Sequence, residues 1–211
     1  MTDASAELRS LLHDRIAAHD RPGAVAAALA AVTGGEIAIP ELYDLLAAYL
    51  VDVGTSWKSG ETEVWQEHYA TAAVRTIVEA CHPLLAERAV APNGRTVVLA
   101  TPPEEYHDLG LRMLADRFTL AGWTAHLLGG NVPASELIAA VGELGAEAAV
   151  VSVYTHFHRI ALKQYVEELK AAHPQLRVWV GGAAFAREHD GWPDDTILDP
   201  AQIPSLAGQV G

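Results

Sequence analysis

The spacing of apolar residues divides the chain into two parts. Up to about residue 90, apolar positions recur every three or four residues, which is the spacing of amphipathic helices. Prolines at helix starts and glycines at helix ends separate the helical stretches. The predicted helices cover residues 6–19, 22–32, 39–57 and 61–89, the last one kinked or broken near Pro83. Four helices with short connections predict a four-helix bundle.

Beyond residue 91, short apolar runs alternate with amphipathic helices. Continuous runs rich in Val, Leu and Ala predict buried parallel strands at 95–101, 123–129, 146–154 and 176–182, with 195–199 as a candidate fifth strand. Helices are predicted at 108–122, 133–145, 159–173 and 201–210. This alternation predicts a doubly wound sheet of the flavodoxin-like order 2-1-3-4-5. The expected fold class is therefore α + α/β, with a helical domain at 1–91 and a sheet domain at 92–211.

Composition narrows the classes of function. The 211 residues carry a formal net charge of −13 and no run of Lys and Arg, which disfavours binding to DNA or to anionic membranes. The first residues do not resemble a signal peptide, and no stretch of about eighteen apolar residues predicts a membrane span. A single cysteine, Cys81, excludes an internal disulfide. We therefore expect a cytoplasmic protein that does not associate with membranes.

The loop after the first predicted strand carries candidate chemistry, because ligands of open parallel sheets bind beyond the carboxyl ends of the strands. It contains no glycine pattern of a dinucleotide site or P-loop. His107 is placed to ligate a cofactor, and Glu105 is placed to accept the ring N–H that faces away from the ligand. Gly110 leaves room for a planar group at the start of the next helix. The alternative interpretation is a helix-capping acid beside a solvated histidine.

The same residues resemble a known motif. Glu105-x-His107-x-x-Gly110 is similar to the D/E-x-H-x-x-G motif of cobalamin-binding domains, and the helical part resembles the bundle that covers the corrin in these proteins. The resemblance implies that His107 coordinates cobalt from below, displacing the cofactor's own dimethylbenzimidazole (base-off, His-on binding). It implies that Glu105 orients His107.

The later strands continue the resemblance in the same order. Ser152-Val153-Tyr154 stands where the family has S-x-L or similar, and Gly181-Gly182 is similar to its closing G-G. The resemblance implies that the displaced nucleotide tail enters the sheet domain, where Ser152 hydrogen-bonds it and the two glycines leave room for it. Tyr154 replaces the smaller aliphatic residue that is common at its position.

A second motif lies in the helical part. Trp57, nine residues and then Glu67-His68 match the W-x9-E-H signature of cobalamin-dependent photoreceptors of the CarH-like type. The resemblance implies that Trp57 packs on the adenosyl group of adenosylcobalamin and that Glu67 and His68 line its pocket. From the residues alone, a bundle-core tryptophan beside a polar helix face is the alternative. Lys58 stands where the carotenoid-gene photoreceptors carry a histidine that captures cobalt after light. His68 and histidines on other loops are therefore the candidate upper ligands.

Light sensing is the first functional hypothesis. Light would break the Co–C bond of adenosylcobalamin, and loss of the adenosyl group would change how the bundle contacts the sheet domain, a second copy or an output partner. We therefore expect a homo-oligomer with a protein partner. The residues before position 20 are too few for a helix-turn-helix, so direct DNA binding is not expected.

The second hypothesis is a corrinoid methyl carrier of a methyltransferase system. Such carriers share the two-domain plan but need an open upper face, which Trp57, Glu67 and His68 would obstruct. An adenosylcobalamin-dependent mutase is the least favoured reading, because no substrate-binding barrel accompanies the cobalamin motif. We therefore expect a protein that is not an enzyme.

A third hypothesis extends the first with a second chromophore. Some stand-alone relatives of these photoreceptors hold a bilin beside the cobalamin (photocobilin-like proteins). The loop after the third predicted strand offers aromatic and cationic groups that suit biliverdin. The candidate residues are Tyr154, His156, Phe157, His158 and Arg159. The alternative is a polar loop rim that touches only the corrin side chains.

Overall fold

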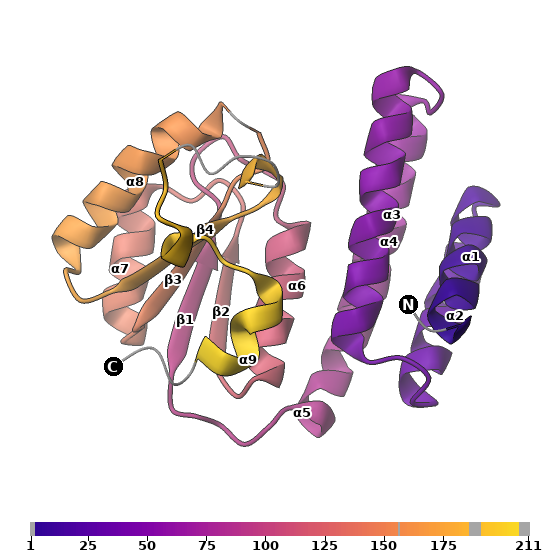
Figure 1. Cartoon of the computed structure of the whole chain (residues 1–211), viewed down its shortest axis with the longest axis horizontal. Coiled ribbons are helices and arrows are strands. Elements are labelled where there is room, and N and C mark those ends of the chain that lie inside the picture. Colours follow the sequence, from indigo (N-terminus) through magenta and orange to yellow (C-terminus); the bar gives the residue numbers. More distant parts are fainter. Residues whose placement is uncertain (1–2, 156, 186–190, 207–211) are drawn as a thin grey trace. The chain divides into compact units, whose positions relative to one another are not determined.

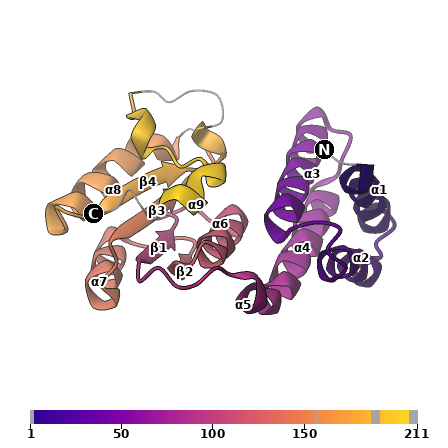
Figure 2. The same cartoon turned by 60° about the horizontal axis from the view of Figure 1, so that its bottom comes forward.

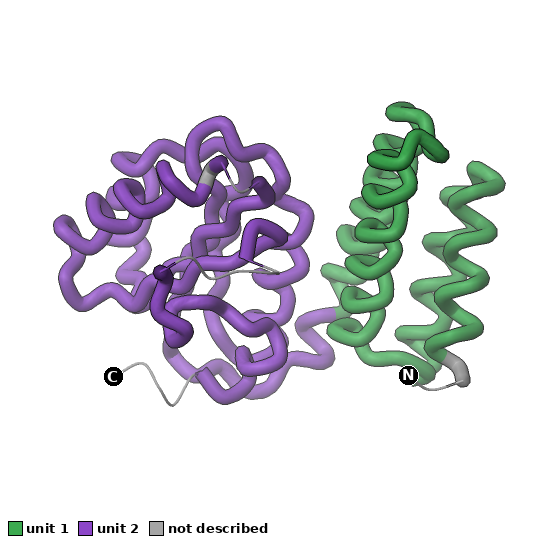
Figure 3. Tube along the Cα trace, turned by 45° about the horizontal axis from the view of Figure 1, so that its top comes forward, with its two compact units in different colours: residues 1–84 green, residues 85–211 purple. Residues whose placement is uncertain are grey.

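The computed structural model describes residues 3–155, 157–185 and 191–206. The chain falls into two compact units, Met1–Leu84 and Leu85–Gly211, coloured separately in Figure 3. The boundary predicted after residue 91 lies a few residues further along the chain. Each unit has its own buried core.

The first unit is the predicted four-helix bundle (Figure 1). Asp20 caps the second helix, because its side chain accepts a hydrogen bond from the backbone N–H of Gly23 at 2.9 Å. Apolar side chains from all four helices form the core, which includes the fully buried Cys81. None of the described helices is both long and apolar enough to cross a bilayer. The helices are α1 (Asp3–Ala17), α2 (Arg21–Thr33), α3 (Ile39–Ser59) and α4 (Val64–Cys81).

The chain after α4 confirms the predicted break near Pro83. The α-helix ends at Cys81 and continues as a 3-10 turn, His82–Leu84, and the short helix α5 (Leu85–Arg88). Proline has no backbone N–H for the helical hydrogen-bond pattern, which explains the break at this position.

The second unit contains a parallel sheet with the order β2-β1-β3-β4, which confirms the predicted order of the first four strands. The strands are β1 (Thr96–Ala100), β2 (Thr124–Gly129), β3 (Ala148–Ser152) and β4 (Arg177–Gly181). The predicted fifth strand is wrong for the part of the chain that the structure describes. The segment 195–199 forms one isolated bridge, from Ile197 to Val180, and a 3-10 turn, Asp194–Thr196, occupies its start.

Helices cover both faces of the sheet (Figures 1 and 2). Val98 and Ala100 of β1 belong to the core on one face, and Val97 and Leu99 belong to the core on the other, as the alternation of a strand requires. The first core includes α7 (Ala134–Leu144) and α8 (His158–Ala172), and the second includes α6 (Leu109–Leu120) and α9 (Ile203–Leu206). With both faces covered, the loops at the carboxyl ends of the strands are the place for a ligand site.

Candidate functional site

Glu105 lies in the loop after β1 and is completely buried. Its Oε1 accepts hydrogen bonds from the backbone N–H of His107 at 3.0 Å and from ring nitrogen Nδ1 of His107 at 2.5 Å. Its Oε2 accepts a hydrogen bond from the backbone N–H of Tyr154 at 2.8 Å. Three donors around one carboxylate compensate for its removal from water.

These hydrogen bonds define the state of the His107 ring. An ionised carboxylate can only accept, so the Nδ1 that faces it carries a proton, and Nε2 is the ring nitrogen that can coordinate a metal. The His107 side chain is 58% exposed, which leaves the ring open to a ligand. The pairing expected from the sequence is therefore present, and it gives an imidazole that fits a metal such as the cobalt of a corrin.

Tyr154 packs against the same imidazole. Its ring stacks on that of His107, with 4.2 Å between the ring centroids and 19° between the planes. The sequence predicted Tyr154 as a larger residue at the tail position and as a candidate bilin contact, not as a partner of His107. Its contact with His107 arises because β1 and β3 are neighbours in the sheet, so that the loops after them meet.

Thr101 and Asn131, which the sequence did not single out, hold the loop in place. The buried Thr101 hydroxyl donates to the carbonyl oxygen of Glu105 at 2.5 Å and accepts from the backbone N–H of Asn131 at 3.0 Å. The Asn131 side-chain oxygen accepts from the backbone N–H of Glu104 at 2.9 Å. Asn131 has a φ of 58°, a conformation that asparagine tolerates. An asparagine directly before Val-Pro is the sequence signal that marks this turn.

The residues predicted for the nucleotide tail lie at the carboxyl ends of β3 and β4. Ser152 pairs with Gly181 across the two strands. Gly182 has a φ of +98°, and a Cβ there would lie 2.3 Å from the carbonyl oxygen of Val153 and 2.6 Å from Oγ of Ser152, so only glycine fits. A Cβ added at Gly181 or at Gly110 would meet nothing within 4 Å. Open space at these two positions fits the room predicted for a ligand.

In the first unit, Trp57, Glu67 and His68 flank the turn between α3 and α4. Trp57 lies in the last turn of α3 and is 45% exposed. Glu67, in the first turn of α4, accepts hydrogen bonds from Nδ1 of His68 at 2.7 Å and from the Thr71 hydroxyl at 2.9 Å. His68 therefore has a carboxylate on Nδ1, as His107 has, and its side chain is 76% exposed.

The structure modifies the prediction of a second-chromophore loop. His156 lies outside the described residues, and the same holds for the side chain of His158, the first residue of α8. Arg159 is buried, donates to the carbonyl oxygen of Ala184 at 3.2 Å and lies 4.8 Å from the centre of the Phe185 ring. Arg159 therefore packs into the unit, and its predicted role toward a bilin stays a prediction.

Comparison with known families identifies the class of protein. Residues 95–201 match the B12 binding domain, and residues 8–82 match a second B12 binding domain model. The first match alone covers half of the chain, so the protein belongs to the family of B12-binding proteins.

Individual relatives refine this assignment. The chain is 39% identical over 150 residues to the HTH-type transcriptional repressor CarH of Myxococcus xanthus, a match that covers 69% of this chain and 48% of CarH. It is 26% identical over 168 residues to the dimethylamine corrinoid protein of Methanosarcina barkeri, covering 78% of each. The chain thus spans about half the length of CarH. It is a cobalamin-binding protein.

A solved structure supports the fold. The monomethylamine corrinoid protein of Methanosarcina barkeri superposes with a TM-score of 0.79 at 18% identity, over 98% of this chain and 99% of that chain. The predicted architecture of a helical bundle followed by a Rossmann-like sheet domain is confirmed.

Exchange of Glu105 for glutamine tests how far this carboxylate controls His107. The amide keeps the size of the carboxylate but has one acceptor oxygen instead of two, so a hydrogen bond to His107 or Tyr154 is lost. We expect the affinity for cobalamin to fall by about 10- to 100-fold. Absorbance titration of the apoprotein measures this, with exposed Glu104→Gln as the matched control. An equal loss in both variants would contradict the orienting role.

Proposed function

We propose that this protein is a light sensor that binds adenosylcobalamin in the base-off, His-on form. The proposal rests on two features of one chain, the Glu105–His107 pair and the W-x9-E-H motif. The parts of the chain that contain them each match a B12-binding model. The identity to CarH and the resemblance to cobalamin-dependent photoreceptors support the light-sensing part. In this role the protein signals, and it catalyses no reaction of its own.

The residues of the second unit hold the lower side of the cofactor. Nε2 of His107 is the coordinating atom, and Glu105 keeps the proton on Nδ1 and fixes the direction of the ring. The stacked ring of Tyr154 opposes rotation of the imidazole. Ser152 and the open space at Gly181 receive the displaced nucleotide tail.

The residues of the first unit recognise the upper ligand. When bound, adenosylcobalamin supplies a cobalt–carbon bond that visible light cleaves. Trp57 offers a flat aromatic face to the adenine base, and Glu67 offers a carboxylate to the ribose hydroxyls. Without the adenosyl group, Trp57 and Glu67, at the adjoining ends of α3 and α4, would lose these contacts. The resulting change in contacts with a second copy or a protein partner is the signal.

Light itself provides the first test. Holoprotein prepared in the dark with adenosylcobalamin is expected to change its absorption spectrum and its molar mass on illumination, because departure of the adenosyl group empties the site beside Trp57. Absorbance and size-exclusion chromatography with light scattering measure the two effects. Holoprotein loaded with hydroxocobalamin, which carries no adenosyl group, is the control. A spectrum and a mass that light leaves unchanged would overturn the proposal.

The Trp57→Ala variant tests recognition of the adenosyl group. Stacking on an aromatic side chain contributes about 1–3 kcal/mol per base, so we expect the preference for adenosylcobalamin over methylcobalamin to fall by roughly tenfold. Competition binding measures this preference. Trp65→Ala is the matched control. Trp65 is also an exposed tryptophan near the turn between α3 and α4, but its ring packs on His19. A preference that changes only in the control would contradict the role of Trp57.

A corrinoid methyl carrier is the second candidate function. The identity to the dimethylamine corrinoid protein of Methanosarcina barkeri favours it. A carrier has to leave the upper face of cobalt open to partner enzymes, so it would bind methylcobalamin at least as tightly as adenosylcobalamin. The same competition assay therefore separates the two functions.

The hypothesis that biliverdin is a second chromophore depends on the loop after β3. Tyr154, Phe157 and Ile160 are 43%, 86% and 79% exposed and could contact a tetrapyrrole. Arg159, which the sequence offers as a partner for its propionates, is buried in this structure. The test is to express the protein in a host that makes biliverdin. A protein that binds a bilin would copurify with a pigment that absorbs far to the red of cobalamin. A purified protein with cobalamin bands alone would exclude the second chromophore.

A further inference from the structure

The bundle contains a cavity that the cobalamin proposal does not use. It has a volume of about 320 Å³ and is lined by α1, α3, α4 and the turns beside them. None of the three residues of the W-x9-E-H motif lines it. Its volume lies at the lower end of the range of small-molecule sites, about 300–1,000 Å³.

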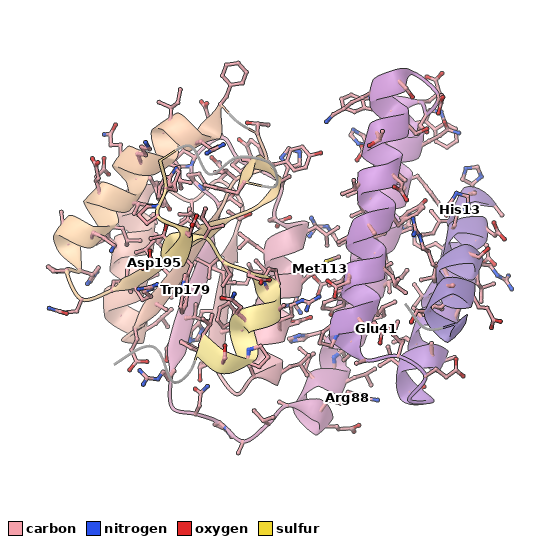
Figure 4. The ribbon with its side chains drawn as sticks, in the orientation of Figure 1. His13, Glu41, Arg88, Met113, Trp179 and Asp195 are labelled. Atoms are coloured by element: carbon pink, nitrogen blue, oxygen red, sulfur yellow. The ribbon has the colours of Figure 1, made fainter. Side chains whose placement is uncertain are left out.

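Aromatic rings form much of the cavity wall. Tyr49 of α3 meets His13 edge to face, with 5.9 Å between the ring centroids, and His13 projects from α1 in Figure 4. Tyr69 of α4 meets His19 in the same geometry at 5.1 Å. Burial raises the pKa of Tyr49 above its ordinary value, so its phenol stays neutral at physiological pH. Neutral aromatic rings of this kind attract cations through their electron-rich faces.

The charge of the lining favours a cation as well. Asp52 and Glu61 line the cavity, and the described lining residues include no lysine or arginine. Arg9 forms an ion pair with Asp52 at 2.6 Å, whereas Glu61 accepts only a long hydrogen bond, 3.4 Å, from Ser56. Arg21 lies 5.1 Å from the centre of the Tyr69 ring, which shows that this ring accepts a cation on one side.

The His19 ring is held in the cavity wall by its neighbours. His19 has a φ of 60° in the turn between α1 and α2, a conformation that histidine adopts more often than most residues other than glycine. Its ring packs on Trp65, at 5.5 Å between centroids, and on Tyr69.

We infer that this cavity binds a small organic cation, an alkylammonium compound whose charged group lies against the tyrosine rings with Glu61 as its counter-charge. Ser56 and Gln66 also line the cavity, and they directly precede Trp57 and Glu67 in the chain. A bound cation therefore steadies the same ends of α3 and α4 that are proposed to contact the adenosyl group. The cation site itself requires no cobalamin.

The test uses choline chloride as the probe. It is titrated into the full-length protein by isothermal calorimetry at constant ionic strength, and 3,3-dimethyl-1-butanol serves as the uncharged molecule of the same shape. We expect choline to bind about tenfold more tightly than the alcohol. Glu61→Gln should weaken choline binding by about threefold or more. Glu36→Gln, which removes the same charge at an exposed position outside the cavity, should leave it unchanged.

A second variant separates ligand binding from folding. His19→Asn suits the positive φ of the turn and so should keep the melting temperature, while it removes the ring from the cavity wall. It is expected to weaken choline binding several-fold. Absence of choline binding, equal binding of choline and the alcohol, or unchanged choline affinity in both Glu61→Gln and His19→Asn would overturn the inference. The assay contains no cofactor, so its failure would leave the cobalamin proposal standing.

Discussion

Replacement of His107 by alanine is expected to abolish the base-off, His-on absorption spectrum of bound cobalamin. In the structure Nδ1 of His107 faces Glu105 and the ring is exposed, so Nε2 is the nitrogen available to cobalt, whereas alanine offers no such atom. Any cobalamin that the variant still binds should show the spectrum of the base-on or water-ligated cofactor. Millimolar imidazole should restore the His-on spectrum, because the space left by the ring admits a free imidazole. A variant that keeps the His-on spectrum without imidazole would disprove the assignment.

The same variant shows whether Glu105 acts through His107. If the carboxylate only orients the ring, Glu105→Gln should cost affinity in the unaltered chain but nothing further in His107→Ala, and a double-mutant cycle measures this coupling. His126→Ala is the matched control, since His126 is an imidazole within β2, opposite Val98 rather than in the loops after the strands. Additive losses from Glu105→Gln and His107→Ala would instead indicate that Glu105 supports the fold of the loop.

The sequence could predict those features that depend on local pattern. Continuous apolar runs located the four strands of the sheet, and the alternation with helices gave their order, because crossover connections restrict the topology. The break after α4 follows from the chemistry of Pro83 alone. The Glu105–His107 hydrogen bond could also be predicted, because only one residue separates the two in a single loop.

Contacts between distant segments could not be predicted in this way. The stacking of Tyr154 on His107 and the support of Glu105 by Asn131 depend on how the ends of β1, β2 and β3 align in the sheet. Arg159 appeared to belong to a polar loop, but packing of α8 buries it against Phe185. A charged residue at a helix start carries no local signal that distinguishes these two environments.

The two glycines at the end of β4 are expected to respond to alanine in opposite ways. In Gly182→Ala, a Cβ would lie 2.3 Å from a backbone oxygen of Val153 at a φ of +98°. Strain and overpacking each cost about 1–3 kcal/mol, so we expect the free energy of unfolding of the apoprotein to fall by roughly 2–5 kcal/mol. In Gly181→Ala the Cβ meets no atom within 4 Å, and stability should stay unchanged or rise by about 0.5 kcal/mol. Urea unfolding of the apoprotein measures both.

The affinity of Gly181→Ala for cobalamin tests whether the nucleotide tail occupies the space beside Gly181. The family resemblance predicts that the nucleotide tail passes Ser152 and Gly181, so a methyl group at Gly181 should obstruct the tail and lower cobalamin affinity by about tenfold or more. A cobinamide, which lacks the nucleotide, should bind Gly181→Ala and the unaltered chain equally well. If Gly181→Ala binds cobalamin as tightly as the unaltered chain does, the tail takes another path. A loss of affinity for cobalamin alone, in a variant that is as stable as the unaltered chain, assigns the space to the nucleotide tail.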